Sequence, residues 1–118
     1  GFRFSENFGK IAENLVAIEL RRKQSLNPNL EIFYWKDYNE KEVDFVVKES
    51  QEIKELVQTC WDLSDFKTKK REVDALIRAS EKLDCDNLLI ITEDFDGEEK
   101  IGNKKIKFLP LWKWLLEL

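Results

Sequence analysis

The sequence contains no histidine and no methionine among its 118 residues. Without histidine, this chain alone cannot build a Ser-His-Asp triad, a Cys-His nucleophile pair or the common histidine-bearing zinc sites. Without methionine, it has no translation start of its own. We therefore expect Gly1 to be an internal, processed or engineered end, and the chain to be a piece of a longer protein.

Cysteine is also scarce, since only Cys60 and Cys85 are present. They form neither a CxxC metal motif nor a disulfide framework, so we expect two packed thiols. Nothing resembles a signal peptide, and the longest apolar runs, such as residues 88–91, are far too short to span a bilayer. These absences predict a soluble, cytoplasmic protein without a membrane partner.

Charge of either sign is abundant, because 37% of the residues are charged against a typical ~25%. The signs nearly cancel, with 20 Lys and Arg against 24 Asp and Glu and a net charge of −4. A global cationic field for nucleic acid is therefore absent, and any contact with DNA must be local. The length fits a single domain over residues 1–118. Lys and Glu enrichment with so little Cys suggests a heat-adapted, intracellular source.

Apolar periodicity and turn signals predict an αβββαβ order followed by a short hairpin and a last helix. The expected helices cover 6–24 (capped by Ser5), a segment opened by Ser64 and Asp65, and 111–118; the expected strands cover 30–36, 42–48, 53–61 and 87–92, with short strands around turns at 96–97 and 102–103. Short links predict an antiparallel meander for the first three strands. The intervening helix predicts that the third and fourth strands are parallel. The fold class is therefore α/β with a mixed sheet.

The same patterns predict which side chains share a face. In 42–48, Val43, Phe45 and Val47 should face one way, and Asp44 and Val46 the other. In the first helix, apolar side chains recur at near-helical spacing at Phe8, Ile11, Ala12, Leu15, Ile18 and Leu20. In the second helix, the expected buried stripe is Phe66, Val73, Leu76, Ile77 and Leu83.

Two carboxylates interrupt these apolar patterns. Glu13 shares a helix face with apolar residues, and Asp44 lies in the middle of a strand, where Asp is disfavoured. Removing a charge from water is expensive unless something compensates it. If the first elements pack consecutively, Glu13, Asp44 and Gln58 converge at one end of the sheet. The alternative is that both acids are partly exposed or are satisfied by backbone donors.

At these residues the sequence resembles known families. Residues 9–16 (GKIAENLV), residues 42–46 (EVDFV) and the αβββαβ order resemble the PD-(D/E)xK nuclease superfamily, which has a restriction-endonuclease-like fold. With residues 57–64 (VQTCWDLS) and 108–114 (FLPLWKW), the whole chain resembles a domain of unknown function found C-terminal to AAA-type P-loop ATPase modules in archaea and bacteria. No G-x-x-x-x-G-K-[ST] loop is present, so ATP would bind to an upstream ATPase module.

The nuclease resemblance implies a site for Mg²⁺, held by carboxylates and by the substrate phosphate, with a lysine that orients the attacking water. Mapped onto this chain, the catalytic positions are Glu13, Asp44, Gln58 and Cys60, and the metal ligands are Glu13, Asp44 and Gln58. Gln58 replaces an acid, although its carbonyl oxygen could still bind a metal. Cys60 stands at the lysine position and supplies no cation. The resemblance therefore implies nuclease architecture with impaired chemistry.

Three functions follow from this mapping. The first is a catalytically impaired accessory or regulatory domain of an AAA-type ATPase, which could contact DNA through Lys67, Lys69, Lys70 and Arg71, or through Lys100, Lys104, Lys105 and Lys107. The second is an active Mg²⁺-dependent nuclease in which Lys48 or Lys54 replaces the missing lysine. The third is a structural interaction domain, in which Trp112 or Trp114 faces a partner because the two point in different directions.

Overall fold

The computed structural model describes residues 4–117, with side chains from residue 7 onward. Its elements are α1 (Phe4–Leu26), β1 (Leu30–Lys36), β2 (Glu42–Glu49), β3 (Glu52–Thr59), α2 (Phe66–Leu83), β4 (Leu88–Thr92), β5 (Gly97–Ile101), β6 (Lys104–Pro110) and α3 (Leu111–Leu116). The predicted order and the α/β class with a mixed sheet are confirmed. The predicted cap, Ser5, lies outside the residues whose side chains are described.

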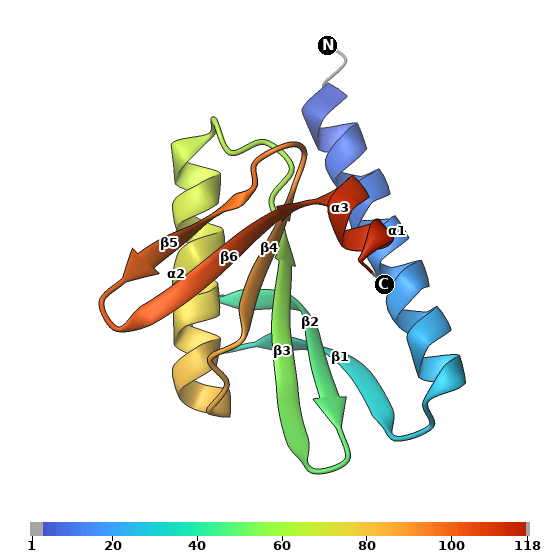
Figure 1. The fold of residues 1–118 in the computed structure, drawn as a ribbon. Helices are drawn as coiled ribbons and strands as arrows, with labels where there is room; N and C mark the ends of the chain where they lie inside the picture. Colours follow the sequence, from blue (N-terminus) through green and yellow to red (C-terminus); the bar gives the residue numbers. More distant parts are fainter. Residues whose placement is uncertain (1–3, 118) are drawn as a thin grey trace.

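The strands in this range form a single six-stranded sheet in the order β1-β2-β3-β4-β6-β5 (Figure 1). As predicted, β1, β2 and β3 form an antiparallel meander, and β3 and β4 are parallel across the α2 crossover. The C-terminal hairpin extends this sheet, because β6 pairs in parallel with β4 and antiparallel with β5. The hairpin is therefore part of the main sheet.

Both faces of the sheet are covered. On one face, α2 packs over a cluster that includes Leu56, Leu76 and Phe108, all fully buried. On the other face, α1 and α3 pack over a second cluster, which includes Val16 and Ile91. The strand β4 lies between the two clusters and is buried along its whole length, as its continuous apolar sequence predicts.

The sheet-facing side of α1 is narrower than the apolar pattern of the sequence. Ala12, Val16 and Leu20 are at most 2% exposed, and their spacing of four residues places them on one side of the helix. By contrast, Ile11 and Ile18 are 50% and 62% exposed. Helix and sheet therefore approach through Ala12, Val16 and Leu20, and Ile11 and Ile18 remain on the flank.

The start of α2 differs from the sequence prediction in a similar way. Asp65 caps the helix, and its side chain accepts a hydrogen bond from the amide of Thr68, as expected of an acidic N-cap. Phe66 was predicted to be buried, but it is 74% exposed, so that part of the prediction was wrong. Phe66 is the first helical residue, and the buried residues of α2 begin at Val73, two turns later.

A β-bulge in β2 changes the direction of the side chains near Asp44. Trp35 pairs with Val43 and Phe33 pairs with Val46, so Asp44 and Phe45 together lie opposite one residue of β1. The extra residue interrupts the alternation. Val43 therefore joins the cluster under α2, whereas Phe45 joins the cluster under α1. The prediction that Val43 and Phe45 share a face was wrong.

None of the helices described within residues 4–117 combines the length and the apolarity that a membrane span requires.

Candidate functional site

The candidate site lies where β2 and β3 separate. The last paired residues of the two strands at this end are Phe45 and Val57. Beyond them, the backbone amide and the hydroxyl of Thr59 donate to Oδ2 of Asp44, at 2.9 and 3.2 Å. The amide of Asp44 in turn donates to Oε1 of Gln58, at 2.8 Å. Side chains thus replace the ladder hydrogen bonds at this point, and they fix the Asp44 carboxylate in place.

Gln58 connects three elements beneath the site. Its side chain is fully buried. Its Nε2 donates to the backbone oxygen of Glu42 at 2.7 Å and lies 3.5 Å from that of Glu72 on α2. Both Nε2 hydrogens are directed at backbone oxygens, and one lone pair of Oε1 accepts from Asp44. Gln58 therefore acts here as a buried brace that positions Asp44.

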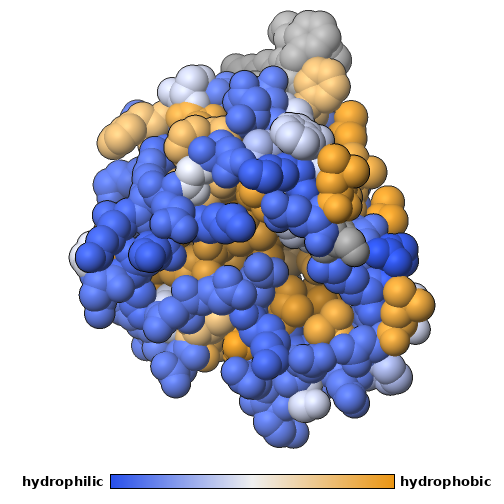
Figure 2. Space-filling model, viewed as in Figure 1, coloured by the Kyte–Doolittle hydropathy of each residue, from blue (hydrophilic) through white to orange (hydrophobic). Residues whose placement is uncertain are grey.

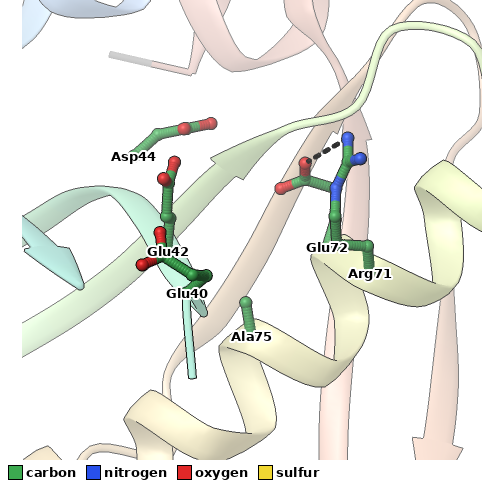
Figure 3. A pocket seen from close by; sticks show the side chains of 6 residues that line it. All are labelled: Glu40, Glu42, Asp44, Arg71, Glu72 and Ala75. Atoms are coloured by element: carbon green, nitrogen blue, oxygen red, sulfur yellow. Dashed lines mark ion pairs between the residues drawn. The ribbon is translucent and has the colours of Figure 1, made fainter. Parts of the chain in front are cut away.

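A cavity of about 300 Å³ opens next to this brace. Its lining consists of Glu40, Glu42, Asp44, Arg71, Glu72 and Ala75. Figure 3 shows the carboxylates of the β2 side facing α2, which carries Glu72 and Arg71. The Arg71 guanidinium lies 3.8 Å from the Glu72 carboxylate, and the Arg71 side chain is 68% exposed. The lining is strongly acidic, with Arg71 as its cation.

Burial and the charges of neighbouring acids raise the pKa values of two of these acids. Burial raises the pKa of Asp44 to about 6; the hydrogen bonds from Thr59 oppose the shift, and the charge of Glu13 adds to it. Burial raises the pKa of Glu72 to about 7, and the charge of Asp44 adds to that shift. Near neutral pH, Glu72 therefore remains partly protonated, and Asp44 takes up its proton at a slightly lower pH.

The structure brings the predicted acids to the same region. Glu13 is exposed on α1 and does not line the cavity, yet its charge acts on both Asp44 and Glu72. Glu13, Asp44 and Gln58 thus lie near one end of the sheet, and their roles in metal binding or catalysis stay predictions. Sequence reasoning missed Glu72, although a signal existed: Glu72 lies one helical turn before the fully buried Leu76, and so on the sheet side of α2.

The position at which the nuclease resemblance implies a lysine is occupied by Cys60, whose thiol is uncharged. Cys60 is only 2% exposed, and burial raises the pKa of its thiol to about 12, with a further contribution from the charge of Glu72. The two lysines considered as replacements lie at the other end of β2 and β3. Lys48 pairs with Ile53 next to the β2–β3 turn, and Lys54 forms an ion pair with Glu52 at 3.1 Å.

We expect Cys60 to resist alkylation in the folded protein. A thiol reacts as the thiolate, and burial suppresses both its ionisation and its contact with reagent. Iodoacetamide labelling at about pH 8, read by intact mass, should give no adduct on the native chain and two adducts in denaturant, because Cys85 is also buried. Rapid single labelling at Cys60 of the native chain would contradict this assignment.

The predicted nucleic-acid-binding residues do not form one free cationic face. Lys69 forms an ion pair with Glu99 and lies over the ring of Phe108. Lys70 pairs with Asp74 on the next turn of α2, at 2.7 Å. Arg71 lines the acidic cavity, and Lys67 is exposed. The four basic residues therefore lie in three different environments: two are paired with acids, one lines the cavity and one is exposed.

No group of three or more acidic or cysteine side chains within the described residues is gathered closely enough to hold a metal ion. The carboxylate oxygens of the cavity have the chemistry that Mg²⁺ prefers. Their arrangement does not form a ready set of ligands, and near neutral pH a cation would compete with the proton that Glu72 partly retains.

Comparison with known proteins gives a family match and one close relative. Residues 8–59 match DUF4143, a domain of unknown function. The chain is also 44% identical, over 119 aligned residues, to the uncharacterized protein MJ1544 of Methanocaldococcus jannaschii. That alignment covers 96% of this chain and 26% of the relative, so the chain spans about a quarter of the curated relative's length. No solved structure matches the chain.

Proposed function

We propose that this chain is an accessory domain of a longer protein, with nuclease-like architecture and a regulatory or docking role in place of efficient cleavage. The observation that carries the proposal is the uncharged, buried thiol of Cys60 beside an acidic cavity. Metal-dependent phosphodiester hydrolysis requires a bound cation and stabilisation of the developing negative charge. Here Glu72 retains part of its proton near neutral pH, and no lysine belongs to the cavity lining within the described residues.

The rest of the longer protein is the proposed partner. The curated relative is almost four times as long as the segment that it shares with this chain, which supports additional modules in proteins of this type. The resemblance described above implies that such a module is an AAA-type P-loop ATPase, where ATP would bind. Trp112 on α3 is 59% exposed, whereas Trp114 is buried, so Trp112 is available for such a contact.

Two observations favour docking over nucleic-acid binding. The cavity is lined by four carboxylates and one guanidinium, so it repels a phosphate backbone in the absence of metal. Lys69 and Lys70 are already paired with acids of this chain. Contacts to phosphates depend on cations that are free to release counter-ions.

A second candidate function is Mg²⁺-dependent cleavage with Arg71 in the place of the lysine. Arg71 lines the same cavity as Asp44 and Glu72, and this observation favours the alternative. Its guanidinium can neutralise a phosphate oxygen but stays protonated, so it cannot take a proton from water. Under this alternative, Asp44 and Glu72 would bind the cation.

Plasmid nicking distinguishes these functions. We expect no nicking above the buffer rate with Mg²⁺ or Mn²⁺ at about pH 8, where Asp44 and Glu72 are largely ionised. Asp44→Asn and Arg71→Ala should behave like the wild type, as should Asp94→Asn, an exposed control outside the cavity. Nicking by the wild type that is lost in Asp44→Asn but kept in Asp94→Asn would establish the nuclease alternative.

DNA binding and docking are measured separately. We expect no salt-sensitive retardation of DNA by the wild type, and saturable binding of this chain to the remaining part of the longer protein. Retardation that weakens with salt and is lost in Lys67→Ala would establish nucleic-acid binding without cleavage.

A further inference from the structure

A broad groove lies between the end of β1 and the second half of α2. Its volume is about 600 Å³, and its lining includes Trp35, Asp37, Tyr38, Arg78, Lys82 and Leu83. A lining that combines apolar rings with a few charged groups is typical of small-molecule sites, and so is a volume of this size. None of these residues lines the acidic cavity, so the groove is a separate site.

The groove differs in kind from the apolar flank of α1. Figure 2 shows hydrophobic residues gathered along the edge where Figure 1 draws α1. Hydrophobic side chains alone carry no charge that would select one ligand over another. The groove instead places charged and aromatic side chains together, and this combination limits the chemistry of the ligand that it can bind.

Trp35 and Leu83 form the apolar wall of the groove. Both are partly buried and pack against the core cluster under α2. Tyr38, in the turn after β1, is fully exposed at the rim. A planar ring that enters the groove can therefore lie against the Trp35 side chain and be contacted by the Tyr38 ring. Stacking on aromatic side chains is a general way of holding a nucleobase, because every base has a flat π-face.

A buried carboxylate holds Arg78 at the side of the groove. The Nε of Arg78 lies 3.2 Å from Oδ2 of Asp37, whose side chain is only 9% exposed. Both atoms are buried, and neither has a hydrogen-bond partner within the described residues, so the contact is an ion pair with poor hydrogen-bond geometry. Asp37 is held in this orientation because its Oδ1 accepts from the backbone amides of Asn39 and Lys41, both at 2.9 Å.

This contact leaves most of the Arg78 guanidinium available to a ligand. The ion pair is made through Nε, so it does not engage the donors of the Nη atoms. The Arg78 side chain is 42% exposed, so these donors can be reached from the groove. A planar guanidinium binds pairs of oxygen atoms on a phosphate or a carboxylate.

A second cation lies beside Arg78. Lys82 is one helical turn further along α2, is exposed and lines the same groove. Lys36 also lines the groove, but it is paired with Glu40 at 2.6 Å, so these two charges offset each other. Arg78 and Lys82 can contact separate oxygens of one phosphate group, which carries more acceptor oxygens and more charge than a carboxylate.

We propose that this groove binds a mononucleotide. The base lies against Trp35 and Tyr38, and the phosphate accepts hydrogen bonds from the Nη atoms of Arg78 and from Nζ of Lys82. Asp37 does not touch the ligand and is a positioning residue that holds Arg78. This site is separate from the docking role proposed above, so either proposal can fail without the other.

Titration of adenosine monophosphate into the ¹⁵N-labelled chain, followed by NMR, tests the site. We expect saturable shifts of the backbone amides of residues 35–38 and 78–83. Tyr38→Ala and Lys82→Ala should each raise the dissociation constant by about 10-fold. Phe66→Ala and Lys67→Ala are the matched controls, because they remove an exposed aromatic ring and an exposed cation outside the groove, and they should leave the dissociation constant unchanged.

Arg78→Lys separates recognition from charge. Lysine keeps a cation that can pair with Asp37 but lacks the planar fork. We expect the affinity for adenosine monophosphate to fall by about 10-fold while the urea midpoint stays close to that of the wild type. A folded Arg78→Lys variant that binds adenosine monophosphate as tightly as the wild type would overturn the assignment of Arg78.

Two further probes identify the chemistry of the ligand. Inorganic phosphate should bind much more weakly than adenosine monophosphate, because it has no ring. Indole-3-acetate should also bind more weakly, because it carries a carboxylate in place of the phosphate. No saturable shift with adenosine monophosphate at up to about 10 mM would overturn the proposal. So would tighter binding of either probe, or shifts confined to residues outside the groove.

Discussion

Lowering the pH from about 8 to about 5 should raise the free energy of unfolding by roughly 2–4 kcal/mol. The folded-state pKa values of Asp44 and Glu72 are raised to about 6 and about 7. Between about pH 4 and about pH 7 the folded chain therefore binds more protons than the unfolded chain, so stability falls as pH rises through this range. Acids whose pKa is lowered, such as Asp37 and Asp86, act in the opposite direction, and only near or below their usual range.

Urea unfolding at several pH values measures this dependence. Glu72→Gln should remove much of it and should stabilise the chain at about pH 8, because one of the repelling charges is gone. Glu98→Gln, on the exposed strand β5, is the matched control and should leave the pH profile unchanged. A wild-type profile that is flat from about pH 5 to about pH 8 would show that the pKa values of Asp44 and Glu72 are not raised in the folded chain.

Gln58→Glu should be strongly destabilising at about pH 8, by about 3 kcal/mol or more, and much less so at about pH 5. The ionised carboxylate loses the donor to the Glu42 backbone oxygen and adds a buried charge close to Asp44. At low pH, the protonated side chain can donate to Glu42 and accept from Asp44, as Gln58 does. The restored stability should appear as a midpoint in urea close to that of the wild type.

Gln58→Leu is the matched comparison, because it removes the same hydrogen bonds without adding a titrating group. Its destabilisation should be similar at both pH values. If Gln58→Glu were instead as stable as the wild type at about pH 8 and also bound Mg²⁺ more tightly, position 58 would be a functional acid position and the brace assignment would be wrong.

Much of the fold could be predicted from the sequence because its elements are locally encoded. The polar turns fix the meander, and the crossover rule makes β3 and β4 parallel. The bulge at Asp44 could not be predicted, because it depends on the register between β1 and β2. Without that register, strict alternation is the default expectation, and it misplaces Val43.

The candidate site was predicted in part for related reasons. Asp44 and Glu13 are conspicuous because they interrupt apolar patterns. Glu72 is inconspicuous, since it follows a cationic run that reads as a solvent face. The apolar stripe that includes Leu76 indicates which side of α2 faces the sheet, but only the folded structure shows that Glu72 lies in the same cavity as Asp44. The actual role of Gln58 likewise depends on backbone groups of β2 and α2 that no local pattern predicts.

The position of β6 inside the sheet governs how the domain can be completed during synthesis. Because β6 lies between β4 and β5, the strand made last fills a gap that the earlier strands leave open. Until residues 104–110 leave the ribosome, the hydrogen-bonding edge of β4 is unpaired and β5 has no neighbour. Nascent chains halted before this segment would expose the unpaired apolar edge of β4. Exposed strand edges of this kind promote aggregation and binding by chaperones.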